Sequence, residues 1–230
     1  GFPLDLTQLM ARERNLSVDE EGFNLEMEKQ RTRAREAHKT VEIKVKADGD
    51  ETQSTKFLGY EPENLTGFSA NCQGLVRDGE NAYLFFDQTP FYAEMGGQVG
   101  DSGTVEIGGE TFPVGKVSKD AAGRFLHPVS GDFTEDPSGQ TAVLNVDLSR
   151  RLAIQRHHTA THVLHWALRK VLGDHVRQAG SLVEPNRLRF DFSHFEGVTS
   201  AQIEEIEGLA NEHLLANDAV EAIEIPYAEK

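Results

Sequence analysis

The stretch of residues 150–173, RRLAIQRHHTATHVLHWALRKVLG, constrains the fold and chemistry of this chain more than any other. Its apolar residues recur at the spacing of an amphipathic helix. Two histidines in it, His158 and His162, stand four positions apart. Side chains at this spacing lie on the same face of a helix, close enough to hold one metal ion. The stretch therefore predicts a long helix that carries a candidate metal site.

A helical wheel at about 100° per residue separates the histidines of this helix. His157 falls in the middle of the apolar arc, where we expect a core or hydrogen-bonded histidine. His158 and His162 fall just past the edge of the arc, and Thr161 lies on its rim beside them. A cleft between this helix and a neighbouring sheet would open at such an edge. The pattern thus singles out His158 and His162 as site candidates.

The spacing of two histidines is by itself a weak signal, because it also arises by chance. A zinc-protease site needs a glutamate directly after the first histidine, and Thr159 occupies that position. Neutral imidazoles suit Zn²⁺, which usually takes four ligands, or three and a water. The chain does not obviously supply the others. Its single thiol, Cys72, is expected to pack as a small apolar residue.

The charge of the chain is unevenly distributed. The 230 residues carry a formal charge of −15, which argues against binding nucleic acid over the whole surface, including DNA. Residues 150–189 nevertheless carry a net charge of +6 and five histidines. This basic island predicts that an anionic substrate is held locally, although an ordinary solvated helix face would have the same charges.

Composition also limits the setting of the protein. An apolar content of 38% with 27% charged residues is typical of a globular chain, and no apolar run is long enough to span a bilayer. A single cysteine and no visible secretory signal favour the reducing cytoplasm. The first residue is Gly1, so we expect the chain to be an internal piece of a longer protein.

Three segments that differ in their residue patterns are predicted along the chain. Residues 1–40 are expected to form a helical connector, with Asp19 as an N-cap. Residues 41–146 contain short apolar or alternating runs separated by turn residues, which indicates a small antiparallel barrel or sandwich. Residues 147–230 are expected to be α+β, opening with the long helix. The fold class is therefore α+β.

Several local features refine this prediction. The pair Gly108–Gly109 is typical of a hairpin turn. Asp147 or Ser149 is suited to cap the long helix, and Gly173 to end it. After this helix we expect a loop at 173–186 and a strand at 187–194. A capping box of Thr199 and Gln202 is expected to open a second helix, whose apolar stripe consists of Ile203, Ile206, Ala210 and Leu214. A strand at 219–227 is expected to close the chain.

The β segment also contains a glycine-rich stretch, FYAEMGGQVGDSG, at residues 91–103. Its glycines predict unusual backbone angles or the close approach of another chain segment or ligand. Gln98 follows Gly96 and Gly97 directly, so we expect its amide to be presented outward from a constrained loop. A tight turn with a β-bulge explains the same residues without any function.

Three motifs in this order resemble the editing domain of bacterial alanyl-tRNA synthetases. They are FYAEMGGQVGDSG, HHTATHVLHWAL at residues 157–168, and VRQAGSLVEPNRLRFDFSHFEGVT at residues 176–199. The opening GFPLDLT and the charged segment after it resemble the part that joins the aminoacylation and tRNA-recognition region to that domain. The resemblance covers essentially the whole chain and implies a two-layer α/β editing domain of the threonyl/alanyl-tRNA synthetase type after the barrel.

The resemblance implies a zinc site with two ligands in this chain, His158 and His162. The family supplies the other two from a Cys-x-x-x-His motif, which we expect to follow residue 230. On this interpretation the site is incomplete and the chain alone binds zinc weakly and is inactive. The ATP-dependent activation site of the family is expected to precede residue 1. His157 departs from the family, which often has asparagine there.

The family editing domain hydrolyses Ser-tRNA(Ala) and Gly-tRNA(Ala), which a single pocket cannot fully reject. The resemblance implies that Thr161, Gln178 and Ser181 line the amino-acid pocket. It also implies that Gly96, Gly97 and Gln98 form a loop that packs toward this site. Basic residues are expected to meet phosphates of the acceptor end of tRNA(Ala), namely Arg150, Arg151, Arg156, Arg169 and Lys170.

Two other functions remain open from the sequence. One is a free-standing hydrolase that edits mischarged tRNA in trans, although such proteins usually begin near the barrel. The other is a module that contacts tRNA without catalysing any reaction. The number of copies in the assembly is not indicated by any residue pattern.

Overall fold

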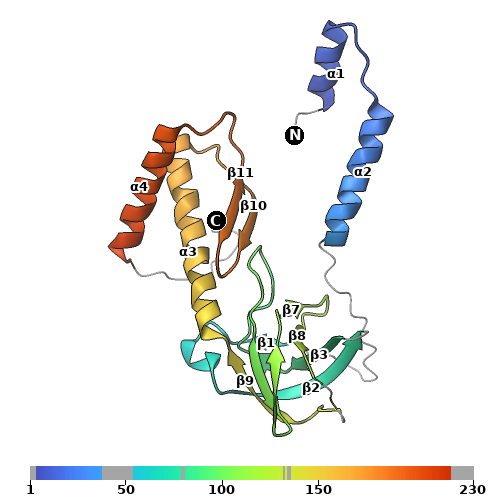
Figure 1. The fold of residues 1–230 in the computed structure, drawn as a ribbon, viewed down its shortest axis with the longest axis vertical. Coiled ribbons are helices and arrows are strands. Elements are labelled where there is room, and N and C mark those ends of the chain that lie inside the picture. Colours follow the sequence, from blue (N-terminus) through green and yellow to red (C-terminus); the bar gives the residue numbers. More distant parts are fainter. Residues whose placement is uncertain (1–3, 38–53, 79–80, 132, 134–135, 219–230) are drawn as a thin grey trace, which may run out of the picture. The chain divides into compact units, whose positions relative to one another are not determined.

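The computed structural model describes most of the chain (Figure 1). The described residues are 4–37, 54–78, 81–131, 133 and 136–218. The chain divides into two compact units, Gly1–Glu42 and Ile43–Lys230. The predicted boundary after residue 40 and the closing strand at 219–227 lie outside the described residues. None of the described helices is long and apolar enough to cross a membrane.

The first unit contains two helices, α1 (Leu4–Glu13) and α2 (Glu20–Ala37). Asn15, with a positive φ of 55°, lies in the turn that follows α1. Asp19 lies just before α2, and its carboxylate accepts the backbone N–H of Gly22 at 2.8 Å. The helical character predicted for this segment and the Asp19 cap are thereby confirmed for the described residues.

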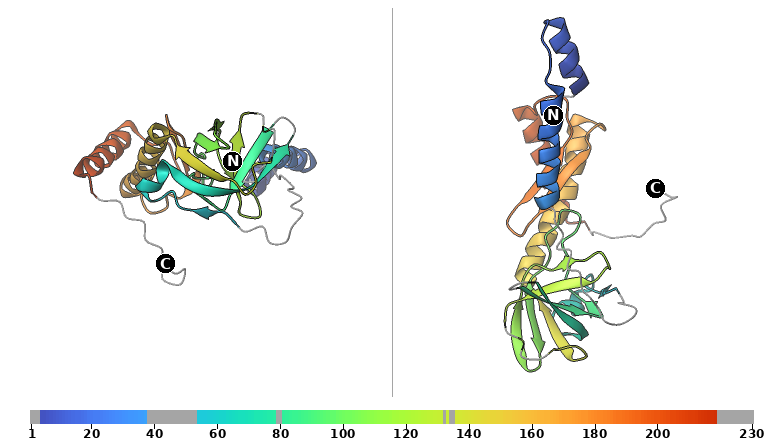
Figure 2. Two further views of the ribbon diagram at one scale, coloured as in Figure 1. Left: turned by 90° about the horizontal axis from the view of Figure 1, so that it is seen from below. Right: turned by 90° about the vertical axis from the view of Figure 1, so that its right-hand side faces the viewer.

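The second unit begins with a closed antiparallel barrel, so the barrel prediction is confirmed and the sandwich alternative is wrong. Its strands follow the order β3-β2-β9-β5-β6-β8, and pairing of β3 with β8 closes the ring. The right-hand view of Figure 2 shows them curving around a common interior. The six strands are β2 (Phe68–Asp78), β3 (Asn81–Phe86), β5 (Gly103–Ile107), β6 (Glu110–Val114), β8 (Phe125–Val129) and β9 (Thr141–Val146).

Local sequence signals explain the turns of this barrel. Gly108 and Gly109 join β5 to β6 with φ values of 62° and 83°, as the hairpin prediction required. Strand β2 has a bulge between Cys72 and Gly74, which bends it so that it pairs with both β3 and β9. Cys72 packs in the barrel core, and its burial raises the pKa of the thiol to about 11. Cys72 therefore behaves as the predicted small apolar residue.

Short elements accompany the barrel. They are β1 (Lys56–Phe57), the 3-10 helix η1 (Pro62–Leu65), β4 (Gln88–Thr89) and β7 (Ser118–Lys119). Strands β1 and β4 pair in parallel, and β7 extends the sheet beside β8.

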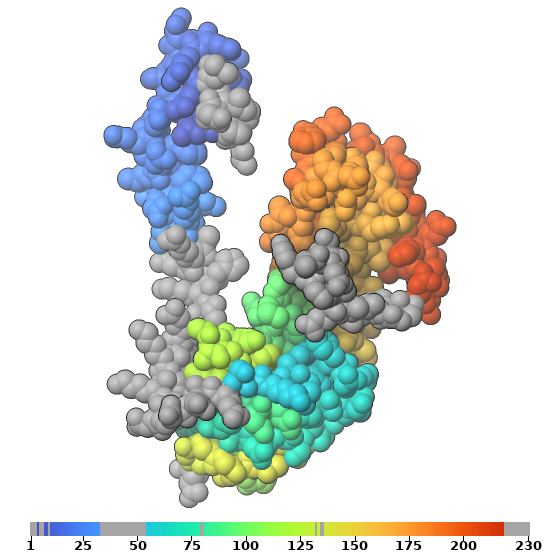
Figure 3. Space-filling model, turned by 180° about the vertical axis from the view of Figure 1, so that it is seen from behind, coloured from blue at the N-terminus to red at the C-terminus, as the bar shows by residue number. Residues whose placement is uncertain are grey.

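The remaining elements form an α+β layer. They are α3 (Leu148–Leu172), β10 (Gln178–Val183), β11 (Leu188–Phe192) and α4 (Ser200–Ala216). Strands β10 and β11 form an antiparallel hairpin, and α3 and α4 pack side by side (Figures 1 and 2). Figure 3 shows the side chains of these elements, orange to red, gathered into one continuous mass. Two layers of this kind bury the apolar faces that each element presents.

The caps of both helices are as predicted. Asp147 accepts the backbone N–H of Arg150 at 3.1 Å and so caps α3, while Gly173 ends it. Thr199 and Gln202 form the capping box of α4. Residues 178–183, predicted as part of a loop, are instead strand β10. The loop prediction was wrong because the glycine within QAGSLV weakens the strand pattern of this segment in the sequence. Pairing with β11 nevertheless makes the segment a strand.

The core of this layer lies between α3, α4 and the hairpin. Phe190 and Phe192 of β11 pack against it, as their alternation predicts. Ile206 and Ala210 of α4 also face it, whereas Ile203 and Leu214 are exposed, so the predicted apolar stripe is only half buried. Among the described residues, the buried apolar side chains of this core are Ala167, Leu168, Leu172, Val176 and Ile206.

Candidate functional site

The two candidate histidines form a stacked pair on α3. The ring centroids of His158 and His162 are 5.1 Å apart, and the ring planes are inclined by 27°. Both residues are exposed as a whole, although the hydrogen bond of His158 to Gln98 is partly buried. Partial burial, and secondly the neighbouring His162, lower the pKa of His158 below its ordinary value. The neutral form of His158, which is the form that binds metals, is therefore favoured.

The glycine-rich loop between β4 and β5 reaches this pair. The side chain of Gln98 is 7% exposed, and its amide oxygen lies 2.5 Å from Nδ1 of His158. The prediction that the Gln98 amide points outward was therefore wrong. The loop itself is held against β10, because the N–H of Val99 donates to Val183 and the N–H of Val183 donates to Gly97.

Gly97 permits this close approach, whereas Gly96 lies in open space. A Cβ atom on Gly97 would collide with the backbone carbonyl of Ser181, and its φ of 84° is in the left-handed region. Gly96 has a φ of 62° but no atom within 4 Å of the Cβ position. Gly97 is therefore required by both its backbone angle and its contact with Ser181, whereas Gly96 is required by its backbone angle alone.

The three residues proposed for the amino-acid pocket lie on two adjacent elements. Thr161 of α3 is 7% exposed, and its hydroxyl donates to the backbone carbonyl of His157 at 2.8 Å. Gln178 and Ser181 lie on β10 opposite Phe192 and Phe190, and residues paired across antiparallel strands point to the same face. A bulge between Gln178 and Gly180 brings this about, since a regular strand would place residues 178 and 181 on opposite faces.

Because Phe190 and Phe192 pack against the helices, Gln178 and Ser181 lie on the helix side of the hairpin. Thr161 and Ser181 thus belong to facing elements, and Gly97 contacts the backbone of Ser181. Thr161 is next to His162 on α3, and Ser181 contacts the loop that carries Gln98, whereas Gln178 is exposed at the start of β10. Whether they bind an amino acid stays a prediction.

Other histidines of the layer have structural partners. Nδ1 of His157 lies 2.7 Å from the carbonyl of Glu184, which ties α3 to the end of β10. His157 is therefore the hydrogen-bonded histidine that its place on the wheel predicted. His165 packs its ring against Phe190, with the centroids 5.1 Å apart.

The basic residues at the start of α3 are engaged by the protein. Arg151 is 4% exposed and forms an ion pair with Asp101 of the loop, while also donating to the carbonyls of Gly59 and Pro90 at 2.8 and 2.9 Å. This burial corrects the expectation that Arg151 meets phosphates. Arg150 is half-buried and donates to the carbonyl of Gly100 at 2.8 Å.

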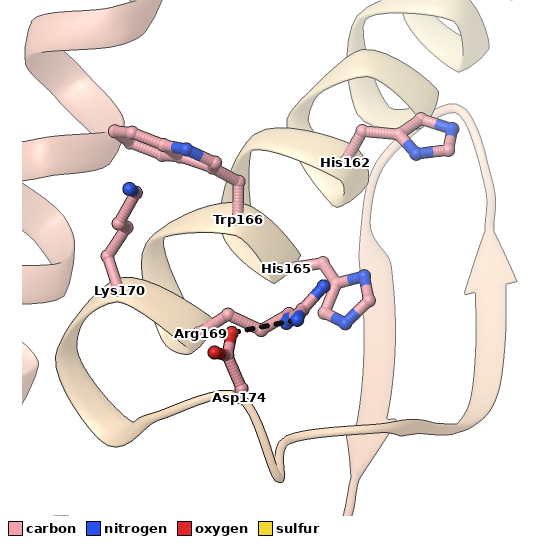
Figure 4. A pocket seen from close by; sticks show the side chains of 6 residues that line it. All are labelled: His162, His165, Trp166, Arg169, Lys170 and Asp174. Carbon is pink, nitrogen blue, oxygen red and sulfur yellow. Dashed lines mark hydrogen bonds and ion pairs between the residues drawn. The ribbon is translucent and has the colours of Figure 1, made fainter.

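Arg169 lies farther along α3, in a groove that adjoins His162. Its guanidinium forms a 2.8 Å ion pair with Asp174, but 41% of its side chain is exposed. Figure 4 shows Trp166 extended toward α4, where its ring stacks on His213, and His165 on the opposite side. The groove encloses about 370 Å³ and is lined by His162, His165, Trp166, Arg169, Lys170 and Asp174.

A zinc ion fits the histidine pair in part. The two imidazoles share one helix face, and the Gln98 contact occupies Nδ1 of His158, so its Nε2 is left for a metal. Two imidazoles fill two of the four positions that zinc usually takes. Within the described part of the chain, no group of three or more His, Cys, Asp or Glu side chains is placed to hold a metal.

Comparison with known proteins identifies the family. Residues 1–150 match the family model described as tRNA synthetases class II (A). The match covers more than half of the 230 residues, and the chain belongs to this family.

Its similar relatives are alanine–tRNA ligases. That of Opitutus terrae is 48% identical over 238 residues, covering 100% of this chain and 25% of the relative. That of Hydrogenovibrio crunogenus is 48% identical over 226 residues, covering 96% of the chain and 26% of the relative. That of Methylacidiphilum infernorum is 45% identical over 228 residues, covering 99% and 23%. The chain thus spans about a quarter of the length of these curated relatives.

Proposed function

We propose that this chain is the editing region of an alanine–tRNA ligase and that it hydrolyses Ser-tRNA(Ala) and Gly-tRNA(Ala). The observation that carries the proposal is the stacked pair of His158 and His162 beside a basic, aromatic groove on α3. The similarity to alanine–tRNA ligases over the whole chain supports the choice of substrate. A mischarged tRNA combines the two features that this surface would recognise, an amino-acyl ester and a polyanion.

Zinc is the metal that the donor set suits best, with His158 and His162 as its ligands in this chain. When bound, zinc would supply a Lewis acid that polarises a carbonyl and lowers the pKa of a bound water. The ligands that complete the set would come from outside the described residues or from water.

The polar groups around the pair would sort amino acids. Thr161 uses its hydroxyl proton in the helix, so its oxygen is left as an acceptor for a substrate hydroxyl or amine. Gln178 and Ser181 would add donors and acceptors from the facing strand. A pocket built to hydrogen-bond serine disfavours alanine, because alanine would leave the polar groups that it encloses unpaired. Glycine would be admitted by size and held through its amine and ester.

The groove would hold the RNA end of the substrate. Arg169 and Lys170 contribute positive charge, and the exposed face of Trp166 offers a surface on which a nucleobase can stack. Asp174 neutralises part of the Arg169 charge in the free protein, so phosphate would compete with it for the guanidinium. Arg150, already bonded to Gly100, would contribute less than the sequence predicted.

The wider activity follows from the same assignment. In the complete ligase, another region would activate alanine with ATP and charge tRNA(Ala), and this region would remove the errors. Such an enzyme would work in the cytoplasm, where its tRNA is charged.

Hydrolysis of purified Ser-tRNA(Ala) by the complete ligase tests this proposal. We expect His162→Ala to reduce deacylation by at least about 100-fold, because a metal ligand is lost, while alanine activation by ATP is unchanged. Glu205→Ala, at an exposed position of α4 that does not line the groove, is the control and should deacylate normally. Unchanged clearance of serine by the His162 variant would refute the assignment of the site.

A further inference from the structure

The side chain of Gln98, in the loop between strands β4 and β5, contacts the histidine pair at His158. We infer that Gln98 is a positioning residue that fixes the His158 imidazole as the tautomer protonated on Nδ1. This leaves the lone pair of Nε2 directed away from the loop and free to bind a metal. The inference rests on the proposed metal-dependent hydrolysis for its purpose, but the tautomer itself is a property of the protein without metal.

The chemistry of the contact decides the position of the proton. An amide oxygen accepts hydrogen bonds and donates none, so the 2.5 Å contact between Oε1 of Gln98 and Nδ1 of His158 requires a proton on Nδ1. A neutral imidazole carries one proton, and Nε2 is then the unprotonated nitrogen. Histidines that bind metals through one nitrogen usually donate from the other in this way.

The amide of Gln98 is held in place by the backbone around it. Met95 and Gln98 close a turn through reciprocal backbone hydrogen bonds of 3.2 and 3.0 Å. The residues on either side bond to β10, with Gly97 accepting from Val183 at 2.8 Å and Val99 donating to Val183 at 3.1 Å. Gln98 is also buried. The amide oxygen is therefore presented to α3 from a fixed support.

His162 provides the internal comparison. Within the described residues, its ring stacks on His158 but shows no hydrogen bond to either nitrogen. The protein thus fixes the proton of one histidine of the pair and leaves the other to solvent. Changes at Gln98 should act on His158 and leave the tautomer of His162 as it is.

The tautomer can be read directly by nitrogen NMR of metal-free protein labelled on histidine, above the ordinary imidazole pKa. We expect His158 to show Nδ1 protonated in the native chain. Gln98→Met removes the acceptor at similar size and should shift His158 toward the Nε2-protonated form that a free imidazole prefers. Gln98→Glu retains an acceptor oxygen and should restore the native signature. Native His158 protonated on Nε2, or a Met variant with an unchanged spectrum, would overturn the inference.

Zinc titration of the same proteins gives a second readout. We expect the affinity for zinc alone to fall by about 10-fold or more in Gln98→Met and to recover in Gln98→Glu. Equal affinities in all three proteins would overturn the role of Gln98 toward a metal. If the tautomer and the affinity respond as expected but Ser-tRNA(Ala) is not hydrolysed by the complete ligase, the proposed function fails and the positioning role of Gln98 stands.

Discussion

The buried guanidinium of Arg151 joins the long helix to the barrel. It contacts the carboxylate of Asp101 in the glycine-rich loop and two backbone carbonyls, and both charged side chains are almost fully buried. A buried charge of this kind is tolerated only because its partner and hydrogen bonds are in place. The start of α3 is thus fixed to the same loop that presents Gln98.

Removing the guanidinium should therefore be costly. We expect Arg151→Met to lower the free energy of unfolding by about 3–5 kcal/mol, because the carboxylate of Asp101 is left buried without its partner. Urea denaturation followed by circular dichroism measures this. Arg156→Met, an exposed arginine on the same helix, is the control and should change stability by less than about 0.5 kcal/mol.

The double change of Arg151→Met with Asp101→Asn separates charge from packing. It should recover part of the loss, because no unpaired charge remains. A double variant as unstable as Arg151→Met alone would show that lost packing, and not the unpaired carboxylate, causes the effect.

His127 is a second buried polar residue, inside the barrel. Its Nδ1 lies 3.1 Å from the carbonyl of Leu84 and its Nε2 lies 2.8 Å from the hydroxyl of Thr89. Burial lowers the pKa of His127 from 6.5 to about 4. Nothing in the sequence pattern singled out this histidine, since it occupies an ordinary inward position of a strand.

The lowered pKa of His127 predicts a dependence of stability on pH. Between pH 6.5 and about 4 the unfolded chain binds a proton at this histidine that the folded chain does not. The free energy of unfolding should therefore be highest above pH 6.5 and fall by up to about 3 kcal/mol as the pH drops to about 4. Denaturation of the native protein and of His127→Gln across this range measures it. Parallel pH profiles for the two proteins would contradict the assignment.

At the scale of elements, the glycine-rich loop and strand β10 hold each other in position. The loop supplies a backbone partner to Val183, and β10 supplies the surface on which Gly97 rests. The bulge in β10 then turns Gln178 and Ser181 to the same face. The barrel and the α+β layer are linked here through backbone hydrogen bonds, and the approach of Gly97 to Ser181 leaves no room for a Cβ atom.

Alanine at Gly97 should separate these elements. We expect Gly97→Ala to cost about 3 kcal/mol, from the left-handed backbone and the collision with Ser181. Gly96→Ala has the same left-handed strain but open space, and should cost about 1 kcal/mol. Amide hydrogen exchange of Val99 and Val183 should accelerate in the Gly97 variant only. Equal protection in both variants would mean that the loop does not depend on the close approach.

For the molecule as a whole, local signals in the sequence predicted the elements well. The α+β class, the barrel, the Gly108–Gly109 hairpin and the caps at Asp147 and Thr199 each depend on residues close together in the chain. The histidine spacing also predicted a shared helix face correctly.

Features that depend on distant residues were missed. The contact of Gln98 with His158 joins positions 60 residues apart, and a wheel or an alternation pattern carries no information about it. The family resemblance indicated only that the loop packs toward this site. The burial of Arg151 was missed for the same reason, because charge in a sequence does not reveal which charges the fold will enclose. The bulge in β10 depends on its register with β11, which the glycine alone does not determine.

The charge pattern of the whole chain leads to the last prediction. A chain with a formal charge of −15 should bind RNA only where positive charge is concentrated, and the α3 groove with Arg169 and Lys170 is such a place.

We expect the double change of Arg169→Glu and Lys170→Glu to weaken binding of tRNA(Ala) by about 10-fold or more at low salt. It should also reduce the dependence of log affinity on log salt by about two, one for each lost phosphate contact. Fluorescence anisotropy at several salt concentrations measures both quantities. The double change of Lys56→Glu and Lys116→Glu, at two exposed lysines that do not line the groove, adds the same negative charge and is the matched control. If this control weakens binding and its salt dependence as much as the double variant, the RNA is held by overall charge and not by the groove.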